Sequence, residues 1–179
     1  MRTALAISLL AVVAVIGCTP PAIRHPGPRL RVGDPAPPLQ VTRWLNGEPV
    51  ARLEPGTPYV LEFWATWCGP CLEAMPHLAE LAKRHEAAGL VVIPVTTVGG
   101  RNPRAAVESY VAANGPRFGF RYAVCEDRRM QSDWYEAAGQ EGIPCTFVVD
   151  RRGKIAFIGH PMEAERAIDI VVAGAGPNN

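Results

Sequence analysis

Residues 59–71 read YVLEFWATWCGPC, an apolar run that ends in two cysteines separated by two residues. The part up to Trp67 is apolar and aromatic, which predicts a buried strand. The residues after Cys68 predict a helix, because apolar side chains recur there at helical spacing. Pro70 fits the first turn of that helix, where a missing N–H costs nothing. The chain is therefore expected to be organised around a strand that leads into a helix through Cys68 and Cys71.

The spacing of the two cysteines suggests redox chemistry. Cysteines three positions apart on a helix face the same side and can close a disulfide. Cys68 begins the helix, where free N–H groups and the helix dipole favour a thiolate, and it is expected to be exposed. Cys71 lies one turn deeper and is expected to be less exposed. This asymmetry provides an attacking and a resolving thiol, as exchange through a mixed disulfide requires. Half of a zinc site has the same spacing, so the flanking strand and helix carry the argument.

This stretch resembles the active site of thioredoxins. With the features below, the chain resembles the membrane-anchored thioredoxins of the TlpA/ResA type, from about Val32 to Ile170. The expected fold is α/β: a thioredoxin-like fold with an N-terminal β-hairpin and a central strand-helix insert. The resemblance implies a thiol–disulfide oxidoreductase that uses Cys68 and Cys71 as a redox-active disulfide, with no cofactor and no metal.

Composition supports a single exported domain. The chain has 179 residues and a formal net charge of +1, which gives no electrostatic basis for binding nucleic acid. Its five cysteines are too few for a disulfide scaffold. Arg2 and the apolar run 4–16 are typical of a targeting segment, and residues 15–18 (VIGC) resemble a bacterial lipobox, which makes Cys18 a lipidation site. An uncleaved signal anchor is the alternative.

Four segments are expected along the chain. They are a lipoprotein signal peptide over residues 1–17, a Pro-rich tether over 18–38, a thioredoxin-like domain over 39–173 and a C-terminal tail over 174–179. The tether is expected to be extended, at about 3.1 Å per residue.

The pattern of turns and apolar runs predicts the remaining elements. Asn46-Gly47 predicts a hairpin between strands over 39–44 and 48–53. A parallel strand over 90–95 should be irregular near Pro94, because proline removes a ladder N–H. Asn102 and Pro103 predict the start of a helix over 103–113, which residues 114–116 stop. An insert made of a strand over 121–125 and a helix over 130–138 follows, and then a final helix over 163–172.

Residues 142–150 read GIPCTFVVD and resemble the thioredoxin loop that carries a cis-proline opposite the two cysteines. The resemblance implies a substrate groove there. Its expected lining is Trp67, which would also shield the cysteine pair, with Gly69, Pro70, Ile143 and Pro144.

Glu62 interrupts an apolar strand six residues before Cys68. Thioredoxins carry a buried acid at this position, which takes the proton of the resolving cysteine, and burial raises a carboxyl pKa toward that task. A solvated Glu62 at a strand end is the alternative. TlpA/ResA-type proteins commonly carry a further glutamate three residues after the second cysteine, where this chain has Ala74. Glu73 is offset by about 100° on the helix and is expected to be solvated.

Three further residues have open assignments. Cys145 follows the expected cis-proline and is either a third thiol near the disulfide or a buried strand residue. Cys125 is expected in the core, and a Cys125–Cys145 disulfide is an alternative that sequence does not decide. His160 is expected to be a loop residue.

The expected function is an exported, membrane-tethered oxidoreductase that reduces disulfides. The resemblance implies oxidised exported proteins such as apocytochromes c as substrates, and a membrane thiol-transfer protein as electron donor. The domain would be anchored in the cell envelope through Cys18 and would face the periplasm or extracytoplasmic space. The alternative is a copper metallochaperone that binds through Cys68, Cys71 and His160, since thiolates are soft ligands.

Overall fold

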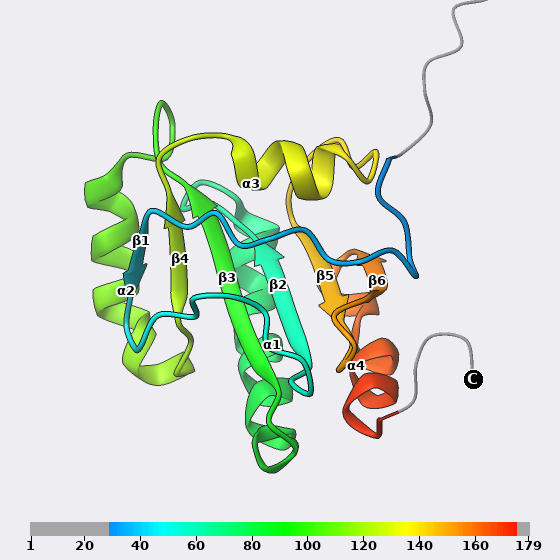
Figure 1. The fold of residues 1–179 in the computed structure, drawn as a ribbon. Coiled ribbons are helices and arrows are strands. Elements are labelled where there is room, and N and C mark those ends of the chain that lie inside the picture. Colours follow the sequence, from blue (N-terminus) through cyan, green and yellow to red (C-terminus); the bar gives the residue numbers. More distant parts are fainter. Residues whose placement is uncertain (1–28, 175–179) are drawn as a thin grey trace, which may run out of the picture.

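The computed structural model describes residues 29–174 of the chain. Within this range one sheet is formed, with the strand order β1-β4-β3-β2-β5-β6 (Figure 1). The strands are β1 Arg43–Leu45, β2 Tyr59–Phe63, β3 Val91–Thr97, β4 Tyr122–Cys125, β5 Cys145–Val149 and β6 Ile155–Gly159. The helices and helical turns are α1 Gly69–Arg84, η1 Glu86–Ala88, α2 Arg104–Phe118, α3 Arg129–Gln131, η2 Ser132–Glu136, η3 Pro161–Glu163 and α4 Glu165–Val172.

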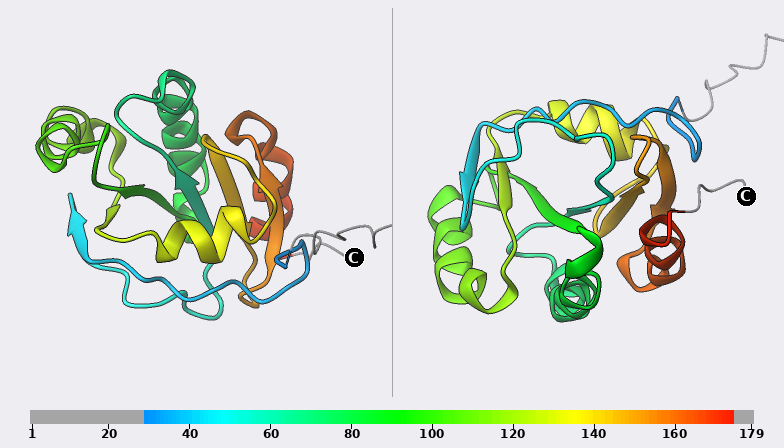
Figure 2. Two further views of the ribbon diagram at one scale, coloured as in Figure 1. Left: turned by 90° about the horizontal axis from the view of Figure 1, so that it is seen from above. Right: turned by 60° about the horizontal axis from the view of Figure 1, so that its bottom comes forward.

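Helices cover both faces of the sheet. α1, α2 and α4 lie on one face, and α3 with η2 lies on the other, where the N-terminal segment also crosses the strands (Figures 1 and 2). The strands β2, β3 and β4 pair in parallel, whereas the other neighbouring pairs are antiparallel. The α/β class and the strand-helix insert expected from the sequence are confirmed, and β4, α3 and η2 form that insert.

The central strand β2 separates two buried clusters because its side chains alternate between faces. Val60 and Trp64 pack with α1 in one cluster, and Leu61 and Phe63 pack with the insert in the other. All five residues of β2 are buried. The strand therefore fixes the start of α1, which follows it after five residues, within a packed core.

The expected N-terminal β-hairpin is wrong. Only Arg43–Leu45 forms a strand in this region, and it pairs with β4, while residues 48–53 form no strand. Asn46 has a positive φ of 57°, as a turn requires, but its side-chain amide donates to the carbonyl oxygens of Gly115 and Phe120. The turn is thus tied to the end of α2 and directs the chain away from β1.

The expected boundary between tether and domain at residue 38 is too late. Leu30 is buried, Gly33 N–H donates to the carbonyl of Ile155 at 2.7 Å, and Pro35 forms a bridge with Lys154. The segment from Leu30 onward therefore belongs to the domain. The predicted signal peptide, Cys18, the first part of the tether and nearly all of the tail lie outside the described residues.

Two prolines do not interrupt their elements as expected. β3 continues through Pro94 to Thr97, and its pairing with β4 begins only at Val95, so the missing N–H falls outside that ladder. α2 runs through Pro116 to Phe118 instead of ending before Asn114. The Gly115 carbonyl there accepts from Asn46 and from Gly119 N–H, which ends the helix in the left-handed region. Every helix within residues 29–174 falls short of the length and apolar character needed to cross a bilayer.

Candidate active site

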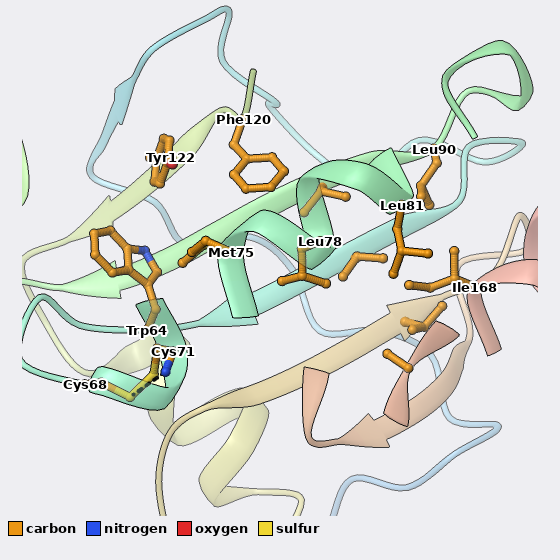
Figure 3. Packing of buried hydrophobic residues seen from close by; sticks show 14 of the residues in the cluster. Trp64, Cys68, Cys71, Met75, Leu78, Leu81, Leu90, Phe120, Tyr122 and Ile168 are labelled. Atoms are coloured by element: carbon orange, nitrogen blue, oxygen red, sulfur yellow. Dashed lines mark hydrogen bonds between the residues drawn. A yellow bond between two sulfur atoms is a disulfide. The ribbon is translucent and has the colours of Figure 1, made fainter. Parts of the chain in front are cut away.

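Cys68 and Cys71 are joined by a disulfide at the N-terminus of α1, with their Cα atoms 5.3 Å apart. Cys68 is the N-cap of the helix, and its Sγ accepts a hydrogen bond from the Cys71 N–H at 3.3 Å (Figure 3). A sulfur atom in this position receives both an N–H dipole and the positive end of the helix. In the dithiol form, these same groups would stabilise a thiolate on Cys68.

The two cysteines differ in exposure, although less than expected. Cys68 is 4% exposed and Cys71 is fully buried. The prediction that Cys68 is exposed is therefore wrong for this oxidised form, because the sulfur is drawn into the helix N-terminus and the apolar cluster under α1. Its neighbours Trp67, Gly69 and Pro70 are exposed, so a partner chain reaches Cys68 across them.

Glu62 is fully buried in β2, on the side of the sheet that faces α1. The solvated alternative is excluded. Burial raises the pKa of its carboxyl to about 8, and the hydroxyl of Thr146, which donates to Oε2, partly opposes that rise. Oε1 has no hydrogen-bond partner within residues 29–174. A carboxyl with this pKa is populated in both protonation states near neutral pH.

Strand β2 brings Glu62 near the deeper cysteine, Cys71. The carbonyl oxygen of Phe63, the next residue, lies 4.0 Å from Sγ of Cys71. The helix α1 packs its buried side chains, Cys71 among them, over this part of the sheet. The deeper cysteine and the buried acid therefore lie in the same layer of the core, below the exposed rim of the site.

A groove lies beside Trp67, the residue before Cys68, on the side of the insert. The Ile143–Pro144 peptide bond is cis, and both residues are half-buried. A cavity of about 620 Å³ is lined by Trp67, Ile143, the loop 98–102 and parts of α3 and η2. Of the groove residues predicted from the sequence, Trp67 and Ile143 line this cavity, and the insert supplies a wall that the sequence did not indicate.

Asn102 organises the loop before Cys68, a role that was not predicted. Its Oδ1 accepts from the N–H and the hydroxyl of Thr66, at 3.0 and 2.8 Å. Its Nδ2 donates to the Thr96 hydroxyl and to the Thr97 carbonyl, both at 2.9 Å. With 4% exposure, Asn102 is a buried amide whose polar atoms are all used. The Asn-Pro pair predicted only a helix start, and burial of the amide has no signal in the sequence.

The other two described cysteines are free and buried. Both lie in the cluster on the face of the sheet opposite α1, and burial raises the pKa of each thiol to about 12. Cys145 pairs with Phe63 on β2, whereas Cys125 lies on β4, three strands away from β5. Three strand spacings amount to roughly 14 Å, so a Cys125–Cys145 disulfide is excluded.

Two remaining expectations concern charged and metal-binding groups. Ala74 is buried at the position of the missing glutamate, and Glu73 is exposed, as predicted. Within residues 29–174 no three His, Cys, Asp or Glu side chains lie close enough together to hold a metal ion. His160 caps η3 instead, where its Nδ1 accepts from Met162 N–H at 3.3 Å. The geometry therefore does not favour the copper-binding alternative.

Most of the chain is similar to thioredoxin-like proteins. The model of the AhpC/TSA family matches residues 32–158. Protein FixW of Rhizobium leguminosarum is 33% identical over 153 residues, which are 81% of this chain and 67% of that protein. The thiol-disulfide oxidoreductase ResA of Geobacillus kaustophilus (strain HTA426) is 30% identical over 158 residues, 88% of this chain and 84% of ResA.

Solved structures extend this likeness to the fold. The solution structure of a thioredoxin-like protein in the oxidized form superimposes with a TM-score of 0.66 at 23% identity, over 82% of this chain and 99% of that one. The resemblance to ResA-type thioredoxins is thus confirmed by sequence, and the thioredoxin-like fold by structure.

Proposed function

The chain belongs to the AhpC/TSA family and is a thiol–disulfide oxidoreductase, and we propose that it reduces disulfides of exported proteins from a lipid anchor. The proposal that this site reduces disulfides rests on one observation. The Cys68–Cys71 disulfide occupies the N-terminus of α1, beside the cis-Pro144 loop and above a buried acid with a raised pKa.

The reaction follows from these positions. In the dithiol form, the Cys68 thiolate attacks one sulfur of the substrate disulfide, and the other substrate sulfur leaves as a thiolate. Cys71 then loses its proton to Glu62 and attacks Sγ of Cys68. The second substrate sulfur leaves, and the Cys68–Cys71 disulfide forms. Two electrons pass to the substrate, which ends as a dithiol, and the enzyme ends oxidised.

Reduction, rather than oxidation, is supported by the Gly69-Pro70 pair between the cysteines, which resembles that of reducing thioredoxins. The regenerating electrons would come from a membrane thiol-transfer protein. The substrates would be oxidised exported proteins, with apocytochromes c as the class implied by the resemblance to ResA-type proteins.

The test of this function is reduction of a protein disulfide by the pre-reduced protein. The wild type is expected to turn over substrate when a dithiol regenerates it, whereas Cys68→Ser and Cys71→Ser should not. Cys125→Ser is the matched control, because it removes a buried thiol that lies outside the site. Equal turnover by wild type and Cys68→Ser would overturn the proposal.

The anchor is a separate part of the proposal. Cys18 would carry the lipid, and the domain would face the periplasm or extracytoplasmic space. Cys18→Ser should release the domain from membranes or leave its signal peptide uncut. Unchanged membrane partition and unchanged processing in this variant would contradict lipidation at Cys18.

A further inference from the structure

A cation lies on the exposed tryptophan beside the disulfide. The guanidinium carbon of Arg101 is 4.7 Å from the centroid of the Trp67 ring, which is the geometry of a cation–π contact. Trp67 is 47% exposed and immediately precedes Cys68. Both side chains line the cavity next to Ile143. A partner chain that reaches Cys68 through this groove therefore passes a permanent positive charge.

The position of Arg101 is fixed by a tight turn. Gly99 and Asn102 exchange two backbone hydrogen bonds, Gly99 N–H to Asn102 O at 3.0 Å and Asn102 N–H to Gly99 O at 2.8 Å. Gly100 in the turn has a φ of 49°, in the left-handed region that favours glycine. Because the Asn102 side chain is anchored to Thr66 and to β3, Arg101 is held at the tip of a braced loop.

The charge of Arg101 has no ion-pair partner in the described part of the chain. The guanidinium takes part in none of the ion pairs found within residues 29–174. The other arginine of the cavity, Arg128, pairs with Glu136. Glu141, two residues before Ile143, also lines the cavity and is likewise outside these ion pairs. Among residues 29–174, the groove thus presents an unpaired cation on Trp67, the residue before Cys68, and an anion near the cis-proline loop.

We propose that Arg101 is a specificity-determining residue, which selects partner polypeptides with a carboxylate next to the cysteine that Cys68 attacks. This inference rests on the proposed function and adds the chemistry of the preferred substrate. Complementary charges at a rim mainly accelerate association and fix orientation, and salt screens them. Arg101 also covers Trp67. An acidic side chain would therefore bind the outer face of the Arg101 guanidinium, while the substrate backbone runs toward Pro144.

The experiment uses two disulfide peptides that differ at one residue beside the cysteine, Glu in one and Lys in the other. The quantity measured is the ratio of their kcat/KM values with the reduced full chain at low ionic strength. The wild type should prefer the Glu peptide by roughly 3- to 10-fold, as expected for one exposed charge pair gained and one repulsion avoided. Arg101→Glu should invert the preference, and Arg101→Gln should abolish it. Taking a ratio cancels any effect of these changes on the reactivity of Cys68 itself.

Arg117→Glu is the matched control. Arg117 also lies over an aromatic ring, that of Phe118, at 5.4 Å. Together with Leu90 and Phe120 it lines a cavity at the end of the sheet where strands β3 and β4 begin. Cys68 lies at the other end of the sheet, because it follows the end of β2. The ratio for Arg117→Glu should equal that of the wild type. A ratio unchanged by Arg101→Glu would overturn the inference alone. Failure of the wild type to reduce either peptide would overturn the proposed function and the inference with it.

Discussion

The Thr146 hydroxyl donates a hydrogen bond to Oε2 of Glu62 across paired positions of β5 and β2. Both residues are fully buried, and a carboxylate in such surroundings costs free energy that one hydroxyl offsets only in part. The pKa of Glu62 is therefore raised to about 8. Glu62 can therefore exchange protons near neutral pH, and it lies in the sheet below the active-site helix.

Glu62→Gln should slow release of product from the mixed disulfide while the first attack by Cys68 is largely unchanged. Glutamine is nearly isosteric but cannot accept the Cys71 proton. The wild-type rate of release should rise with pH through about 8, as Glu62 ionises, and this inflection should be absent in the variant. We expect a reduction of at least about tenfold at pH 8. Single-turnover reduction, with mixed disulfide and product followed separately, measures both steps. Identical release rates at every pH would assign the proton to another acceptor.

The same substitution should stabilise the oxidised protein, and the gain should depend on pH. The folded protein holds the Glu62 proton up to about pH 8, whereas the unfolded chain loses it near the ordinary glutamate pKa of 4.5. Wild-type stability therefore falls as pH rises between these values, at about 1.4 kcal/mol per pH unit. Glu62→Gln lacks this loss. Urea unfolding at pH 4 and pH 8.5 should show a small difference between the two proteins at pH 4 and a few kcal/mol in favour of the variant at pH 8.5. A difference that does not change with pH would contradict the raised pKa.

Cys125 and Cys145 should not react with iodoacetamide in the folded protein at pH 7. Burial raises both pKa values to about 12, so almost no thiolate is present, and neither sulfur is accessible. Both should be labelled at ordinary rates after denaturation, which serves as the internal control. Labelling of Cys145 in the native protein, detected by mass spectrometry, would show that it is exposed to solvent.

Asn102→Leu should destabilise the protein and loosen the loop that precedes Cys68. The change removes four hydrogen bonds and leaves the N–H of the half-buried Thr66 without its acceptor. Buried unsatisfied groups cost about 1–3 kcal/mol each, so a loss of roughly 3 kcal/mol is expected. Asn114→Leu is the control, because that amide makes one bond, to the Tyr110 carbonyl. Urea unfolding reports stability, and equal losses in the two variants would show that Asn102 has no special role.

The parts of the site that were predicted from the sequence are those that depend on local sequence patterns. A buried strand, a helix opened by Cys68 and a proline loop each have signatures within about ten residues, and a glutamate in an apolar strand indicates burial at β2. These are the parts that the structure reproduces most closely.

The errors and omissions come from contacts between distant segments. Asn46-Gly47 is a good hairpin turn, yet the Asn46 amide binds Gly115 and Phe120, and these contacts decide where the chain goes next. Asn102 is 36 residues from Thr66 in the sequence, so nothing local marks it as the brace of the loop before Cys68. The absence of an ion pair at Arg101 within residues 29–174 is equally a property of the assembled groove.

Identifying the sulfur that forms the mixed disulfide tests the assigned roles of Cys68 and Cys71. Reduced Cys71→Ser and reduced Cys68→Ser are each mixed with a disulfide peptide, quenched with acid and mapped by mass spectrometry. Cys71→Ser should accumulate the peptide on Cys68, because attack proceeds and resolution is blocked, whereas Cys68→Ser should accumulate almost none. Accumulation on Cys71 in the Cys68→Ser variant, at a rate equal to that of Cys68 in its counterpart, would contradict the assigned roles of the two cysteines.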